Sequence, residues 1–390
     1  MPTTLNPIYY FALLVFLLAF AGTSFFRGAD ASWHTSTSRT INLDGLRGLL
    51  VISVFIHHAA IYHGYLLHRV WQVPPSTLMT QAGQASVMFF FMITGFLFWS
   101  KAVTSLGRLN WRILYINRYF RIAPLYYFAT LLMLLIVLGV SDFHLRESFL
   151  TLVKEVLPLG LAGFYSADAP INAYRSPSLI LAGVTWTLRF EWLFYLLILP
   201  VSTFFARRKN WHLRYTSLGF LGFTLLSAYQ PGMRLIALMT FFGGMLCASI
   251  QSRFRFVMPA RWNTTLSVII CALLWYLMQF KTAYQTTAIG ILWLIFLIIT
   301  SGCSIFGLLT ARPALRLGEL SYSIYMLQGL LLYAAFYFSA ISTYALNSAI
   351  QYWLVITVTG AMLLAVSLAT HLLIEKPGIL LGKNLSGRFK

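Results

Sequence analysis

Long apolar runs, each about twenty residues long, recur along the 390-residue chain and constrain its fold more than any other feature. Charged residues make up only 9% of the sequence, whereas a soluble domain carries about 25%. About 20 apolar residues are enough for a helix to cross the hydrocarbon core of a bilayer, whereas a membrane barrel shows short alternating segments. The sequence therefore predicts an all-α polytopic membrane protein.

Eleven such runs predict a bundle of about eleven transmembrane helices, at 8–26, 43–63, 82–104, 120–141, 184–206, 211–229, 233–251, 263–280, 286–307, 318–341 and 349–375. The net charge of +19 does not indicate a nucleic-acid ligand, because the basic residues cluster in short connections between the runs. Alternate connections hold twenty Lys and Arg residues, and the opposite connections hold only six. The positive-inside rule then places the N-terminus outside and the C-terminus in the cytoplasm.

One long connection, 142–183, is predicted on the external side. Its sequence "KEVLPLGLAGFYSADAPINAYRSPS" is interrupted by Pro and Gly too often for a standard span. It is predicted to form a re-entrant or interfacial element, or a lid over an external site. The three cysteines lie singly in apolar segments without metal-ligand spacing, so no metal site is expected.

The stretch "LDGLRGLLVISVFIHH" carries ionisable residues into a predicted span, where such residues are costly and are candidates for function. At about 100° per residue, Asp44, Arg47 and His58 share one stripe of the helix, and His58 lies roughly 16 Å deeper than Arg47. One interpretation is an interfacial Asp–Arg pair and a satisfied polar His. The other is that His58 is a general base. His57 lies off the stripe and is predicted to be a packing residue.

Two further stretches carry ionisable groups, one at a membrane depth similar to that of His58 and the other at the cytoplasmic side of the membrane. In "TWTLRFEWLFY", Glu191 is predicted at a depth similar to that of His58, as an orienting partner or as part of a structural ion pair. In "NWRILYINRYFRIAPLYYF", Arg118 and Arg121 share a helix face at the cytoplasmic entry. There they suit a phosphate-rich ligand or anchor the helix to lipid phosphates. The stretches "GELSYSIYMLQGLLLYAAF" and "HLLIEKPG" are interpreted as mainly structural.

Taken together, these stretches resemble, in order from Leu43 to Gly378, the acyltransferase 3 family of integral membrane acyltransferases. "LDGLRGLLVISVFIHH" looks like the family's opening element, DGLRG followed by His, and its spacing selects Arg47 and His58. Later family elements are similar to "FFFMITGFLF", "NRYFRIAPLYY", "TWTLRFEWLFY", "LSYSIYMLQ" and "IEKP". Any one of these motifs is weak, but six in order are specific.

The resemblance implies transfer of an acyl group, usually acetyl, from cytoplasmic acyl-CoA to a hydroxyl of an acceptor at the outer face. It implies acetyl-CoA or another acyl-CoA as the donor substrate. The implied acceptor is a glycan or lipid-linked glycan, such as a cell-surface polysaccharide or lipopolysaccharide O-antigen. The implied location is multi-pass in the bacterial cytoplasmic (inner) membrane, with membrane lipids as further partners and neither nucleic acid nor metal.

Two features depart from the family pattern. Gln328 stands where the family frequently has His, so no proton transfer is expected at that position. A further predicted span, 8–26, precedes the usual start of the family. The expected organisation is an extra N-terminal helix with its cytoplasmic connection (1–42), an acyltransferase membrane domain (43–378) and a short basic cytoplasmic tail (379–390).

The resulting hypothesis makes His58 the general base, with Glu191 or Asp44 orienting it. The phosphates of acyl-CoA are expected on Arg118 and Arg121, together with Arg47. A transporter or flippase for a lipid-linked or small organic substrate explains the intramembrane charges and the topology equally well, but not the ordered motifs. A non-catalytic receptor or scaffold predicts no affinity for acyl-CoA.

Overall fold

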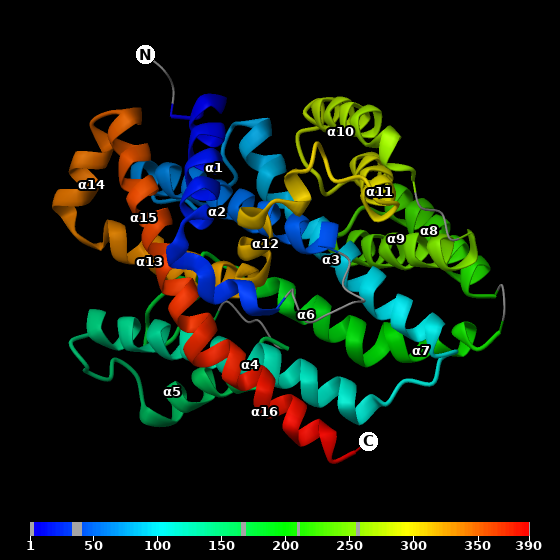
Figure 1. The fold of residues 1–390 in the computed structure, drawn as a ribbon. Helices are drawn as coiled ribbons and strands as arrows, with labels where there is room; N and C mark the ends of the chain where they lie inside the picture. Colours follow the sequence, from blue (N-terminus) through cyan, green and yellow to red (C-terminus); the bar gives the residue numbers. More distant parts are fainter. Residues whose placement is uncertain (1–3, 33–40, 165–168, 209–210, 255–257, 390) are drawn as a thin grey trace. The chain divides into compact units, whose positions relative to one another are not determined.

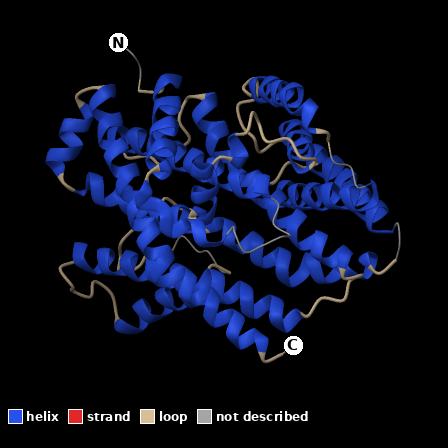
Figure 2. Cartoon of the chain, in the orientation of Figure 1, coloured by secondary structure: helices blue, strands red, loops and turns tan. Residues whose placement is uncertain are grey.

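The computed structural model describes residues 4–32, 41–164, 169–208, 211–254 and 258–389, and the regular elements within them are all helical (Figures 1 and 2). Helices occupy each of the eleven ranges predicted as spans. The described residues exclude part of the predicted first connection, 33–40, and four of the twenty basic residues counted as cytoplasmic: Arg39, Lys209, Arg255 and Lys390.

Among the described residues, six helices are long and apolar enough to cross a membrane, or up to eight if each of two bent pairs forms one span. The bent pairs are Pro7–Gly22 with Ser24–Asp30, at 75°, and Ser321–Tyr337 with Ser339–Leu346, at 92°. The chain is therefore an all-helical protein with six to eight candidate spans. The count of eleven spans and the orientation of the termini remain predictions.

The chain packs as two compact units, which are described separately. The first unit comprises Met1–Leu109 and Phe194–Ser321. Its α-helices are α1 (Pro7–Gly22), α2 (Ile41–His68), α3 (Thr77–Thr104), α7 (Leu199–Ala206), α8 (Trp211–Tyr229), α9 (Met233–Phe254), α10 (Asn263–Leu277), α11 (Thr286–Thr300) and α12 (Arg312–Glu319). Short elements complete it: η1 (Ser24–Ser32), the π-helix η4 (Phe194–Ile198), η5 (Ala260–Trp262) and η6 (Leu308–Thr310).

The second unit comprises Asn110–Leu193 and Tyr322–Lys390. Its α-helices are α4 (Trp111–Val140), α5 (Phe149–Val156), α6 (Trp186–Leu193), α13 (Ser321–Tyr337, whose first residue belongs to the first unit), α14 (Ser339–Leu346), α15 (Ala349–Thr370) and α16 (Lys376–Gly387). Short elements are η2 (Leu157–Leu161), η3 (Pro177–Leu181) and the π-helix η7 (His371–Glu375).

Side-chain caps begin five of the helices. Asn6, Ser76, Asn110, Ser148 and Ser348 each accept a hydrogen bond from a backbone N–H in the first turn of α1, α3, α4, α5 and α15 respectively. Such residues satisfy backbone donors that have no partner inside the helix. The starts of these helices are thus encoded locally.

Both π-helices end two residues before a proline, Pro200 in α7 and Pro377 in α16. Proline has no N–H, and its ring clashes with the carbonyl four residues earlier in a regular helix. A single wide turn absorbs this mismatch, so the helix continues across the proline. In the second unit this turn contains two residues of the candidate site, His371 and Glu375.

Candidate active site

Helix α2 carries three of the residues predicted to act in catalysis or donor binding. An ion pair joins Arg47 Nη1 to Asp44 Oδ1 at 3.8 Å. Arg47 Nη2 also donates a hydrogen bond of 2.8 Å to Ser321 Oγ. The guanidinium is therefore held on two sides at the beginning of α2. His58 follows on the same unbroken helix, so Asp44 and His58 are about 21 Å apart along its axis.

The glycines of the DGLRG stretch allow α2 to approach its neighbours at backbone distance. A Cβ at Gly45 would overlap the carbonyl oxygen of Leu309, and one at Gly48 would overlap the carbonyl oxygen of Ala314. A Cβ at Gly318 of α12 would in turn overlap the carbonyl oxygen of Asp44. These glycines let α12 bring Ser321, which lies two residues after it, to the guanidinium of Arg47.

The two adjacent histidines have different surroundings. His57 is buried, and its Nδ1 lies 2.7 Å from the carbonyl oxygen of Met79 on α3, to which it donates. Its ring lies so close to Gly83 that a Cβ there would overlap it. His57 is thus a helix-contact residue, as its position off the stripe predicts. From 51 to 62, the side chain of His58 alone is not buried.

An aromatic cluster surrounds the end of α2 next to His58. The ring of Trp71 lies 6.3 Å from the imidazole of His58, at an interplanar angle of 27°. Tyr62 and Tyr65 lie 5.9 and 5.8 Å from the ring of Trp71. His58 therefore opens onto a partly exposed aromatic surface rather than onto an aliphatic core.

In the second unit, Arg118 and Arg121 lie on α4, three residues apart and partly exposed. Arg121 Nη2 lies 3.7 Å from Oε1 of Glu375, whose side chain has no exposed area, while that of Arg121 is 27% exposed. A guanidinium has five N–H donors, so one edge can face Glu375 while others remain available to a ligand. Arg118 and Arg121 thus form the basic face that the sequence predicts at the start of this helix.

The carboxylate of Glu375 is fixed by two more groups of the second unit. Ser323 Oγ donates to Glu375 Oε2 at 2.9 Å, and His371 Nδ1 lies 3.2 Å from the same oxygen. Helix α16 runs beside α4 (Figure 1), and Gly378 and Gly382 allow it to approach the backbone and ring of Phe120. Small residues at this contact bring the "IEKP" stretch of the chain to the arginine helix.

Glu191 lies on α6 in the same unit, partly exposed, and interacts electrostatically with the hydroxyls of Tyr322 and Tyr325 on α13. Arg121 and Glu375 also act on the hydroxyl of Tyr322. The second unit therefore gathers the predicted residues Arg121 and Glu191 around one tyrosine. Arg189 is exposed and lies over the ring of Phe190 instead, at 4.9 Å.

Gln328, which stands where the family frequently has His, is fully buried. Its side-chain amide donates a hydrogen bond of 3.0 Å to the carbonyl oxygen of Tyr325. A buried amide bonded to backbone has no proton to exchange near neutral pH. The structure is thus compatible with a purely structural role for this position.

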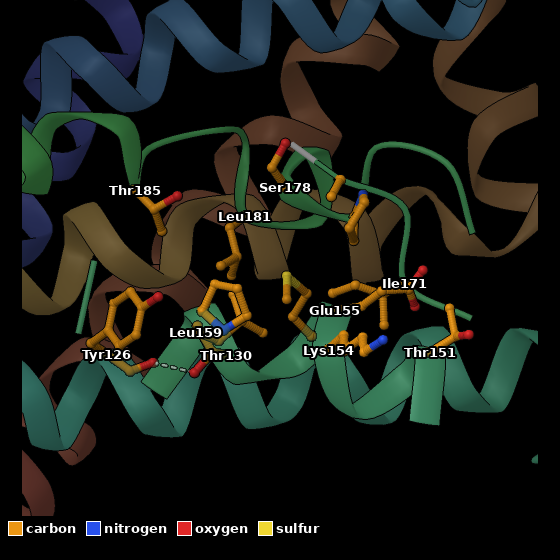
Figure 3. Close-up of a pocket in the computed structure, with 14 residues that line it drawn as sticks. Tyr126, Thr130, Thr151, Lys154, Glu155, Leu159, Ile171, Ser178, Leu181 and Thr185 are labelled. Atoms are coloured by element: carbon orange, nitrogen blue, oxygen red, sulfur yellow. Dashed lines mark hydrogen bonds between the residues drawn. The ribbon is translucent and has the colours of Figure 1, made fainter. Parts of the chain in front are cut away.

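A cavity of about 280 Å³ lies between α4, α5, η2 and residues 169–185 of the second unit (Figure 3). Its lining combines hydroxyl, amine and carboxylate groups with apolar side chains. The lining residues include Tyr126, Thr130, Lys154, Glu155, Leu181 and Thr185. Most of its lining comes from the connection predicted as an external lid or interfacial element. That connection therefore forms a pocket with α4.

Two parts of this arrangement do not follow from the sequence pattern. The stretch with His371 and Glu375 is predicted to be mainly structural, although Glu375 lies on the same predicted side of the membrane as Arg118 and Arg121. That shared side was a signal that the two stretches meet. Trp71 was hidden among the aromatic residues expected at any membrane interface.

Comparison with known proteins decides the family. The model of the acyltransferase domain matches residues 40–372, which is most of the chain. The chain is a member of the acyltransferase 3 family. Together with the candidate spans, this membership indicates a multi-pass membrane acyltransferase that uses an acyl donor and an acceptor. Searches of curated proteins and of solved structures found no match.

Proposed function

We propose that this acyltransferase transfers an acyl group, most simply acetyl, from cytoplasmic acyl-CoA to a hydroxyl of an extracytoplasmic acceptor. The proposed acceptor is a cell-surface glycan such as lipopolysaccharide O-antigen, and the proposed location is the bacterial inner membrane. The observation that carries the proposal is the accessible imidazole of His58 on an otherwise buried stretch of α2. An accessible neutral imidazole is suited to take a proton from a hydroxyl near neutral pH.

In the proposed step, His58 accepts the proton of the acceptor hydroxyl while the hydroxyl oxygen attacks the thioester carbonyl of acyl-CoA. The C–S bond then breaks, the new ester forms, and the imidazolium returns its proton to the departing CoA thiolate. No further reactant is needed. The aromatic surface of Trp71 and Tyr65 beside His58 supports a sugar acceptor, because C–H groups of a sugar ring pack favourably on the electron-rich face of an aromatic ring.

The remaining predicted residues receive roles that follow from their contacts. Arg118 and Arg121 are proposed to bind the phosphates of CoA, because guanidinium groups bind phosphate oxygens with paired hydrogen bonds. Arg47 is proposed to assist them. Asp44 is bonded to Arg47 and lies about 21 Å along α2 from His58. We therefore assign Asp44 to positioning Arg47, and for Glu191 we keep the role that the sequence motif suggests, that of orienting the general base.

The test uses the purified full chain in lipid discs, with labelled acetyl-CoA and a panel of glycan acceptors. The wild-type protein should transfer label, and His58→Ala should lower the rate by at least about 10² because a general base contributes about 10²–10⁴. The matched control is His57→Ala, which removes the neighbouring imidazole. It should keep most of the activity while lowering the melting temperature, since His57 bonds to α3.

Two results would contradict the proposal. Near-normal transfer by His58→Ala would remove the general base from the mechanism. Acceptor movement across the bilayer without any labelled ester would favour the competing transporter or flippase.

A further inference from the structure

The pocket of the second unit is the strongest feature that the proposed mechanism does not use. The helix α5 that forms one wall has an unusual distribution of side chains. Its outward face is apolar, with Phe149, Leu150 and Val153 between 40% and 70% exposed, and Leu157 at the start of η2 is 72% exposed. Its other side carries the partly buried Thr151 and Glu155, which line the pocket together with the exposed Lys154. A helix of this kind lies at a membrane interface with its apolar face in lipid, and its polar face then surrounds a protected space.

The walls of the pocket hold hydroxyl groups in fixed positions. Thr130 donates to the carbonyl oxygen of Tyr126 within α4, at 2.9 Å, and Thr151 pairs with Ser148 at 2.8 Å. Thr185 is only 9% exposed, and its hydroxyl makes no hydrogen bond to another residue within the described parts of the chain. Thr185 lines the pocket, so its hydroxyl can donate and accept hydrogen bonds with a ligand there (Figure 3).

The carboxylate of Glu155 is held in place from outside the pocket. Its Oε2 accepts a hydrogen bond of 2.9 Å from the backbone N–H of Asn172. Asn172 is itself buried, and its side chain bonds to Ser141, to the carbonyl oxygen of His144 and to the N–H of Arg146. The wall formed by the connection is thus fastened to the end of α4, which gives the pocket a defined shape.

The composition of the described lining favours a neutral polar ligand over the phosphate end of the donor. Among the described lining residues, Lys154 and Glu155 contribute one formal charge of each sign. Pro158, Leu159 and Leu181 add apolar surface. A ring with hydroxyls at its edge and C–H groups on its faces matches such a mixture. At about 280 Å³ the cavity is near the lower limit of ligand pockets, which suits one small ring rather than a chain.

The position of the pocket on α4 agrees with an acceptor site. Thr130 lies nine residues after Arg121, which is about 14 Å along the helix in the direction predicted to be external. The acyl end of CoA extends away from its phosphates, so a donor bound at Arg121 would point along α4 toward this end.

We propose that this pocket binds one sugar unit of the acceptor, with Thr185 and Glu155 as hydrogen-bonding partners of its hydroxyls. That this sugar is the acceptor of the reaction rests on the proposed function. The binding of a sugar to the pocket can be measured without turnover. Thr185 and Glu155 are binding residues in this proposal and take no part in the chemical step.

Binding is tested by hydrogen–deuterium exchange on the full chain in lipid discs. The probes are the methyl glycosides of glucose, galactose, mannose, rhamnose and N-acetylglucosamine. At least one of them should slow exchange in residues 149–161 and 171–185, and Thr185→Val or Glu155→Gln should weaken that protection about tenfold. Thr357→Val is the matched control, because Thr357 lies on α15 of the same unit and its hydroxyl donates to the carbonyl oxygen of Trp353 in its own helix. Absence of protection by every glycoside, or stronger protection by lauric acid, would overturn the proposal.

The transfer assay separates this inference from the proposed function. Thr185→Val and Glu155→Gln should raise the KM for the glycan acceptor about tenfold and leave the KM for acetyl-CoA within about twofold. If transfer occurs with an unchanged acceptor KM, the pocket assignment fails and the function stands. If no transfer occurs but glycosides protect the pocket in a manner sensitive to Thr185, the function fails and the sugar site stands.

Discussion

At the scale of single residues, Glu375 shows how a carboxylate far along the chain shapes a basic site. It is fully buried in the second unit, accepts hydrogen bonds from Ser323 and His371, and faces Arg121. Burying a carboxylate is costly unless it has such hydrogen-bonding and charged partners. Glu375 therefore fixes one edge of the Arg121 guanidinium, and we expect it to act on donor binding through that arginine.

Replacing Glu375 by Gln keeps its size and removes its charge. The variant should raise the KM for acyl-CoA about tenfold, equivalent to about 1.4 kcal/mol, with little change in kcat, because Arg121 loses its orienting charge. Steady-state kinetics with varied acyl-CoA concentration measures this split. Asp142→Asn removes an exposed carboxylate of the same unit and should leave both constants unchanged. A fall in kcat alone would argue against a role through the donor site.

At the scale of elements, the contact of α2 with η6 and α12 depends on residues without side chains. Gly45 and Gly48 meet backbone carbonyls of Leu309 and Ala314, and Gly318 meets that of Asp44. Small residues at helix contacts are the usual means by which membrane helices approach closely. The family's DGLRG stretch thus combines an ion pair with a contact surface, and the three glycines let Arg47 lie beside Ser321.

The substitution Gly45→Ala should destabilise the protein by about 1–3 kcal/mol, because the added methyl group overlaps rigid backbone. Gly64→Ala on the same helix is the matched control, since nothing lies within 4 Å of the Cβ it would add. The control should be neutral or stabilising by about 0.5–1 kcal/mol, as alanine is the better helix former. Thermal unfolding in detergent compares the two. Equal melting temperatures would show that the helices are not in close contact at Gly45.

At the scale of the whole molecule, the direction of the chain across the membrane determines which substrate each predicted site can meet. The uneven distribution of Lys and Arg predicts a cytoplasmic C-terminus and an external connection over 142–183, which contains α5. This orientation would place the basic face of α4 toward cytoplasmic CoA and the pocket of Figure 3 toward an external acceptor.

Single-cysteine labelling in intact cells tests the orientation. On a Cys271→Ser background, Arg146→Cys should react with an impermeant maleimide, and Arg388→Cys should react only after the cells are permeabilised. Cys271 is the exposed native thiol, while Cys247 and Cys303 are buried. The opposite labelling pattern would reverse the predicted topology and with it the proposed direction of transfer.

Helices occupy each range that the sequence predicts as a span, although the structure supports only six to eight candidate spans, and contacts within one helix are predicted as well. The pairing of Asp44 with Arg47 and the separate setting of His57 both follow from helical periodicity, which needs no tertiary information. The family match agrees with the ordered motifs. Local rules therefore recover the framework and the residues that one helix brings together.

Contacts between distant segments could not be predicted in the same way. Arg121 and Glu375 are 254 residues apart in the sequence, and they meet because glycines let α16 approach α4. The pocket depends on α5 turning its polar face inward, opposite to the pattern of a soluble amphipathic helix. Hydropathy alone also does not predict the two π turns, which arise from a clash between each following proline and the preceding turn of the helix.

Arg316 has a practical consequence for anyone preparing this protein. It is buried in α12, forms two hydrogen bonds with the carboxylate of Asp30, and donates to the carbonyl oxygens of Ala21, Gly22 and Thr23 at the end of α1. A gene trimmed to the matched limits, 40–372, would encode a chain with this cation buried and unpartnered, and without Glu375 beside Arg121. Expression vectors for crystallography or assay should therefore keep both flanks, and affinity tags belong beyond them.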